Sequence, residues 1–143
     1  MTRKEIQTFI KSGFVQLSES FDFGTGRITE FNAARANSYP SAWLESLIVD
    51  TEYIEPVTLP YDTWPIKIHI ARKDKIDSST EEYEEIINEC DLTAQKVMRF
   101  YNAAKLTVTT GVNRSPFIKK HADCLTGVVL SFNLKLPDTT DVC

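Results

Sequence analysis

The chain has 143 residues, of which 42% are hydrophobic and 25% are charged, values typical of one globular domain with its own core. A formal net charge of −4 argues against a general nucleic-acid binder, which is usually basic. The apolar runs fall short of the roughly 18 residues that a membrane-spanning helix needs. The polar residues 1–5 do not resemble a signal segment, so we expect synthesis in the cytoplasm and no membrane partner.

The first helical pattern lies in residues 3–17, where apolar residues recur three and four positions apart. We expect this helix either to pack on the domain or to dock on a neighbouring molecule. Residues 21–28 have two glycines and alternating aromatic residues, which favours a hairpin or a projecting loop. Residues 1–37 are therefore a candidate extending arm.

Three strands are predicted in the next part of the chain. Residues 43–49 and 51–59 are two candidates, and Pro40 favours the start of a strand over its middle. The clearest strand is 66–70, where isoleucines alternate with other residues. Residues 60–65 contain two prolines and are predicted to form a turn.

The longest pattern, over residues 78–104, predicts a central amphipathic helix. Ser78 and Ser79 stand three residues before Glu81 and Glu82, which is the spacing of a capping box. At ~1.5 Å per residue the helix would be roughly 35–40 Å long, enough to lie across a small sheet. Its apolar face is formed by Tyr83, Ile86, Ile87, Cys90, Ala94, Val97, Met98 and Tyr101.

Two further strands, 106–110 and 125–136, are predicted after the helix, with a loop over 112–123 between them. Residues 137–143 read as a flexible polar tail. The predicted fold is a single α+β domain over residues 1–143. An antiparallel sheet carries an N-terminal helix and one long central helix, in the order α-β-β-β-α-β-β.

No residue pattern indicates catalysis, a cofactor or a metal. His121, Asp123 and Cys124 lie too close together in one loop to be read as a triad, whose members usually come from distant parts of a chain. His69 lacks a second histidine at metal-ligand spacing. The glutamates at the start of the long helix are interpreted as partners of its dipole, and Gly24 with Gly26 as turn residues. We expect a protein that is not an enzyme.

The cysteines Cys90, Cys124 and Cys143 form no Cys-x-x-Cys pair, so we expect them to be reduced, with Cys90 in the core. A small basic patch is predicted from Arg72, Lys73 and Lys75 with Lys119 and Lys120. A solvated rim or a charge partner for a neighbouring subunit is favoured over contact with phosphate. Aromatic residues near predicted turns and loops are candidate subunit-interface anchors, with core closure as the alternative. They are Tyr39, Trp43, Tyr61, Trp64 and Phe117.

Four segments within residues 39–136 form a recognisable set: Tyr39-Pro40-x-x-Trp43, the strand 66–70 with Asp74, Ile86-Ile87 with Cys90, and residues 125–130. Together they resemble a group of small proteins of tailed bacteriophages, especially crAss-like phages that infect Bacteroidetes. The element order is also similar to that of tail-terminator and neck proteins.

This resemblance implies a virion structural protein at the head–tail junction, made in the host cytoplasm. Such proteins form homo-oligomeric rings, contact portal, adaptor and tail proteins, and surround the DNA path without reading its sequence. An acidic chain would let DNA pass without adhering. The resemblance brings no catalytic residue, and it leaves open the copy number and the choice among adaptor, stopper and terminator.

Two other classes of function remain as alternatives. A small enzyme or ligand-binding domain would need a polar cluster between sheet and helix, where the sequence places apolar residues. A non-catalytic adaptor would bind a peptide at an open sheet edge.

Overall fold

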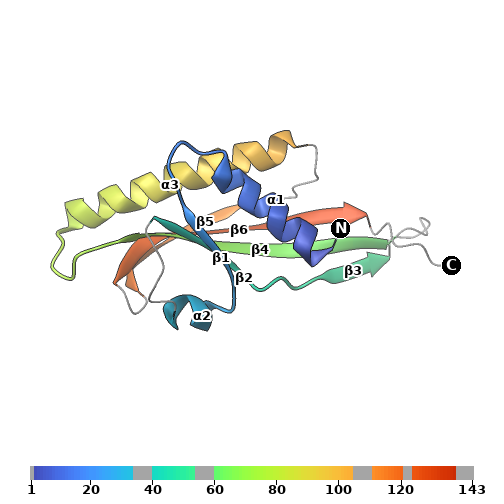
Figure 1. The fold of residues 1–143 in the computed structure, drawn as a ribbon, viewed down its shortest axis with the longest axis horizontal. Helices are drawn as coiled ribbons and strands as arrows, with labels where there is room; N and C mark the ends of the chain where they lie inside the picture. The colour runs from blue at the N-terminus through green and yellow to red at the C-terminus, as the bar shows by residue number, and fades with distance from the viewer. Residues whose placement is uncertain (1, 34–39, 54–59, 105–110, 121–123, 138–143) are drawn as a thin grey trace.

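The computed structural model describes residues 2–33, 40–53, 60–104, 111–120 and 124–137. They form three helices and six strands in one α+β domain (Figure 1). In chain order these are α1 (Arg3–Val15), β1 (Asp22–Gly26), α2 (Ile28–Ala33), β2 (Ser41–Glu45), β3 (Asp50–Tyr53), β4 (Pro60–Lys73), α3 (Thr80–Ala103), β5 (Asn113–Lys120) and β6 (Leu125–Pro137).

The sheet is built around β4 and β6, which pair antiparallel over almost their whole length, from Tyr61 opposite Pro137 to Lys73 opposite Leu125. The strand order is β1-β2-β4-β6-β5, and β3 pairs with the beginning of β4. All pairs are antiparallel except β1 with β2, which are parallel. The predicted fold class is therefore confirmed, while a wholly antiparallel sheet was wrong.

The main core lies between the sheet and the helices α1 and α3, which both cover one face (Figure 1). Alternate residues of β4 and β6 point into it, so Ile66, Ile68 and Ile70 face this core together with Leu130 and Phe132. On the other face α2 covers a smaller cluster of Phe31, Trp43, Ala71, Phe117 and Leu125.

The helix predicted over 78–104 and the strand predicted over 125–136 are present as α3 and β6, with nearly the predicted bounds. The hydroxyl of Ser79 accepts a hydrogen bond from the backbone N–H of Glu82, which caps the start of α3. Cys90 lies in the core as expected. In β6 alternate residues are buried, namely Val128, Leu130, Phe132, Leu134 and Leu136. The predicted strand 106–110 and residues 138–143 lie outside the described residues.

Residues 60–65 are not a turn, because they form the first part of β4. Pro65 is tolerated there for a structural reason. On one side β4 pairs with β3 through residues 60–63 and with β2 through residues 68–71. In the described chain no strand is paired with Pro65 on that side, and a proline is tolerated beside such an open stretch of a strand.

The predicted loop 112–123 was also wrong over its first part, since β5 occupies Asn113–Lys120. Pro116 lies in β5 opposite Val128, and a proline fits here because β5 is at the edge of the sheet. The pairing of β5 with β6 becomes irregular between Phe117 and Lys120.

The predicted hairpin at residues 21–28 is instead β1, followed by the start of α2. Because α2 crosses between β1 and β2, the two strands run parallel, with Gly24 opposite Trp43. Gly24 and Gly26 are not simple turn residues. A Cβ atom on Gly24 would lie 2.4 Å from the Trp43 ring, so this glycine makes room for the indole. The element order thus gains β1 and α2 relative to the prediction.

Candidate interaction surfaces

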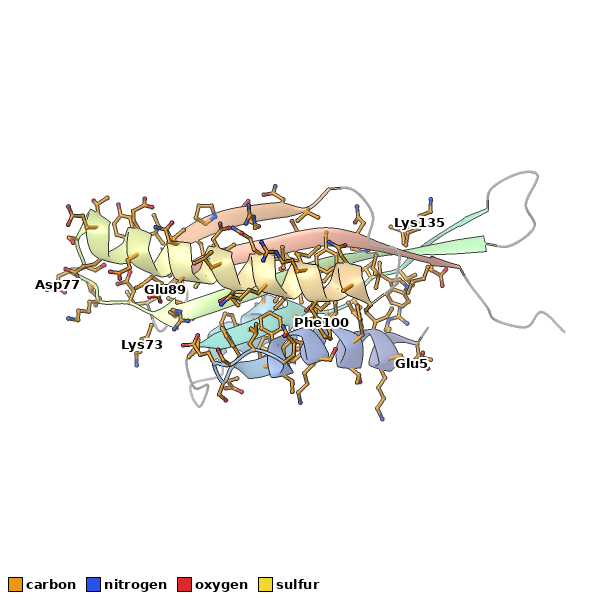
Figure 2. The ribbon with its side chains drawn as sticks, turned by 90° about the horizontal axis from the view of Figure 1, so that it is seen from above. Glu5, Lys73, Asp77, Glu89, Phe100 and Lys135 are labelled. Atoms are coloured by element: carbon orange, nitrogen blue, oxygen red, sulfur yellow. The ribbon has the colours of Figure 1, made fainter. Side chains whose placement is uncertain are left out.

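A groove lies between α3 and the connection from α1 to β1. It has a volume of about 480 Å³, an apolar wall of Leu17, Phe21 and Phe100, and two cations, Lys96 and Arg99, on its α3 side. Figure 2 shows Phe100 on the side of α3 that faces α1. Glu19 also lines the groove, and its carboxylate is paired with Arg72. The groove therefore combines an apolar surface with the positive charge of Lys96 and Arg99, which suits an acidic, partly apolar partner.

The position of this groove depends on how α1 packs on α3. Phe9 of α1 contacts Phe100 and Tyr101 of α3, with ring centroids 6.4 Å and 5.2 Å apart. At the other end of α1, the Arg3 guanidinium lies 5.6 Å from the centre of the Trp64 ring in β4. The helix therefore packs on the domain, which is the first of the two arrangements expected for it.

Arg72 links three elements beside this groove. Its guanidinium donates two hydrogen bonds to the carboxylate of Glu19, one of them at 3.2 Å, and its Nε lies 3.3 Å from Oε2 of Glu89. Because Arg72 forms ion pairs with Glu19 and Glu89 within the chain, it does not belong to the predicted basic patch.

The neighbouring Cys90 is buried in the core, and its burial raises the pKa of the thiol to about 12.

The rest of that patch lies at the end of the molecule where β4 leads into α3. Lys73 and Lys120 are both register partners of Leu125, on opposite sides of β6, so the two backbones lie two strands apart. Beside them the Thr126 hydroxyl donates a 2.6 Å hydrogen bond to the Asp74 carboxylate. Figure 2 shows Lys73 and Asp77 at this end.

On the sheet face that α2 covers, His69 and Glu45 form a partly buried ionisable pair. The His69 Nε2 lies 2.7 Å from Oε2 of Glu45, and the rings of Phe31 and Phe117 lie 6.3 Å and 6.2 Å away. Burial lowers the pKa of His69 below its ordinary value of 6.5, against the opposing effect of the Glu45 carboxylate. The pair joins β2 to β4 and is neutral at the imidazole near pH 7.

Three of the predicted interface anchors are core residues within the chain. Trp43, Trp64 and Phe117 are 8%, 4% and 5% exposed. Trp43 donates from its indole N–H to the carbonyl of Gly26 at 3.2 Å. Tyr61 lies in β4 opposite Pro137, and Tyr39 is outside the described residues. Their role at a subunit interface stays a prediction.

Of the predicted loop residues, His121 and Asp123 lie outside the described residues. Cys124 is half-buried with a φ of +55°, and its carbonyl accepts a hydrogen bond from the N–H of Asp74 at 3.0 Å. In the described ranges, no group of three or more His, Cys, Asp or Glu side chains is arranged to hold a metal ion.

Exposed apolar side chains are the surface feature that the sequence patterns missed. Some lie on the exposed face of a helix or strand, and the others lie in the connections between elements. The largest are Val15, Ile48, Ile76, Leu92, Val112 and Ile118. Leu92 is 55% exposed in the middle of α3, on the solvent-facing side of the helix. That side of an amphipathic helix usually carries polar residues.

Neither a protein-family model nor a curated protein matches the chain. Among the helices that the structure describes, none combines the length and the apolar character required to cross a bilayer.

Proposed function

We propose that this chain is a structural subunit that assembles into a homo-oligomeric ring at the head–tail junction of a tailed bacteriophage, around the path of the DNA. The phage setting, with portal and tail proteins as partners, rests on the sequence resemblance. The assembly of identical copies has support from the shape of the domain.

The observation that carries the proposal is the end of the sheet formed by β3, the start of β4 and the end of β6. This end extends past α1 and α3, so it stands clear of the helical layer (Figure 1). In the described chain β3 pairs on one side alone, with β4. An open strand offers backbone groups to a strand of a neighbour, and a head-to-tail contact between this edge and a different surface of the next copy forms a ring when the rotation from copy to copy closes.

The opposite edge of the sheet is less suited to strand addition. Pro116 removes one backbone donor from β5, and the register changes after Phe117. Prolines and bulges are features that protect edge strands from unwanted pairing. Of these two edges, that of β3 is the proposed ring contact.

Native mass spectrometry of the purified chain, with and without the portal protein of the same genome, tests this function. We expect a single closed oligomer that also binds the portal. The variant Glu52→Pro removes a backbone N–H from β3 and should weaken the ring. The matched control Thr80→Pro places a proline at the first position of α3, where the N–H has no partner within the helix, and should leave the ring intact.

A second candidate function is a peptide-binding adaptor, which the groove beside α3 favours. Its apolar wall and its two cations suit a short acidic peptide with one large apolar side chain. This function predicts a monomer whose affinity for such peptides falls when Lys96 and Arg99 are replaced by alanine.

A further inference from the structure

The outward ridge of α3 carries an unusual order of side chains. The buried side of the helix holds Cys90, Thr93, Ala94, Val97, Met98 and Tyr101. At 100° per residue the line directly opposite passes through Glu81, Glu85, Asn88, Leu92 and Arg99. All five of these residues are exposed. They define what we call the outer ridge of α3.

Leu92 stands near the midpoint of this ridge, since α3 runs from Thr80 to Ala103. The charges on either side of it have opposite signs. Glu85 precedes it by seven residues and Arg99 follows it by seven. Asn88 precedes it by four, and Lys96 follows by four on the flank of the ridge. The ridge is therefore acidic, then apolar, then basic.

Such an order is complementary to itself in one orientation. When a second α3 lies antiparallel across the first, with a two-fold axis through Leu92, residues at equal distances before and after Leu92 face each other. Arg99 of each copy then faces Glu85 of the other, Lys96 faces Asn88, and Leu92 faces its own counterpart. A parallel arrangement would instead place acidic residues against acidic residues.

We propose that the outer ridge of α3 is a docking surface for a second copy of this chain, related by a two-fold axis at Leu92. The occupant is a second copy because the charges match under this symmetry and the apolar residue lies on the axis. Glu85, Lys96 and Arg99 have no ion pair with another residue of the described chain. Exposed ion pairs contribute at most about 1 kcal/mol each, so the contact is a weak one.

This contact goes beyond the proposed ring and does not depend on it. It uses the helical face of the domain, whereas the ring contact uses the β3 edge of the sheet. Where both contacts form, the two-fold contact joins two rings.

Cysteine cross-linking tests the axis directly. Packed helices lie 8–10 Å apart and their Cα atoms lie about 2.3 Å from each axis, so the two Leu92 Cα atoms would be roughly 3.5–5.5 Å apart. This range overlaps that of disulfides. We expect Leu92→Cys, in a background with Cys124→Ser and Cys143→Ser, to form a disulfide-linked dimer under mild oxidation.

Matched controls use positions 81 and 103, which lie eleven residues on either side of Leu92. Two copies of Glu81→Cys would lie ~33 Å apart along the helices and should not cross-link. A mixture of Glu81→Cys with Ala103→Cys should cross-link, because these positions face each other. Absence of the Leu92→Cys dimer, or equal cross-linking of Glu81→Cys alone, would overturn the proposal.

Charge reversal provides an independent test by sedimentation velocity over a range of concentrations. Glu85→Arg and Arg99→Glu should each weaken self-association at this face at least tenfold, since each creates two repulsive pairs. A mixture of the two variants should form a mixed dimer, and the double variant should regain wild-type association. All positions are exposed, and thermal melting verifies that the fold is unchanged.

The outcomes separate this contact from the proposed ring. A wild-type ring with no Leu92→Cys cross-link and no response to charge reversal overturns the two-fold contact and leaves the ring. A two-fold dimer that never forms larger assemblies supports the contact and contradicts the ring.

Discussion

The phenolic hydroxyl of Tyr101 donates a 2.7 Å hydrogen bond to the backbone carbonyl of Ile10, which joins α3 to α1 across 91 positions of sequence. The ring of Tyr101 lies so close to Gly13 that a Cβ there would be 2.5 Å from it. Gly13, which weakens α1 as an isolated helix, thus allows the two helices to approach. These contacts of Tyr101 with α1 hold one side of the groove beside α3 in place.

Replacement of this tyrosine tests how much the hydrogen bond holds the helices together. Tyr101→Phe should lower the free energy of unfolding by about 1–2 kcal/mol, because a buried donor is removed. Urea titration measures the change. Tyr83→Phe is the control, since the Tyr83 hydroxyl bonds to Thr80 at the exposed start of α3 and should change stability by less than about 0.5 kcal/mol. Equal effects of the two substitutions would contradict this account of Tyr101.

The contact between Gly24 and Trp43 predicts a steric effect. Gly24→Val should destabilise the chain by about 1–3 kcal/mol, because its side chain would overlap the Trp43 ring. The control is Thr25→Val, at the next, exposed position of the same strand, and it should be nearly neutral. Thermal unfolding followed by tryptophan fluorescence compares them. A neutral Gly24→Val would show that the indole does not occupy this space.

His69 predicts a dependence of stability on pH. Its folded pKa is lowered by burial, so below about pH 6.5 the unfolded chain binds a proton that the folded chain does not. The free energy of unfolding should therefore fall as the pH drops through 6.5 towards the folded pKa. His69→Gln removes this contribution and keeps the other titrating groups. The stability difference between wild type and variant should shrink between pH 7.5 and pH 5, and a constant difference would contradict the shift.

The burial of Cys90 predicts a thiol that reacts as the chain unfolds. Its pKa of about 12 keeps it protonated at neutral pH, and its side chain has no exposed area. With Cys124→Ser and Cys143→Ser, alkylation of Cys90 should follow the unfolding transition in urea. In the control variant Cys90 is replaced and Cys124 is kept. The Cys124 thiol is half-buried and should be alkylated without denaturant. Fast labelling of native Cys90 would contradict its place in the core.

Sequence periodicity predicted the elements that bury a single face against the core. The stripes of α1, α3 and β6 correspond to buried faces because each element meets the core along one side. The start of β4 and all of β5 were missed because Pro65 and Pro116 suggest a break in a strand. Both prolines are tolerated beside an unpaired strand side, which no local pattern reveals.

The surfaces were harder to predict than the fold. Trp43 and Phe117 looked like interface anchors, and each is buried on the sheet face that α2 covers. That face could not be foreseen while β1 was read as part of a hairpin. Leu92 was overlooked because it lies off the apolar stripe of α3, although a leucine on the polar face is itself a signal.

The mass of the native assembly tests the central proposal most directly. Native mass spectrometry of the purified chain at increasing concentration, with electron microscopy of the same sample, should give closed rings of one copy number that gain mass when the portal protein is added. Monomers and two-fold dimers alone, at the highest concentration reached and with no response to the portal protein, would contradict it.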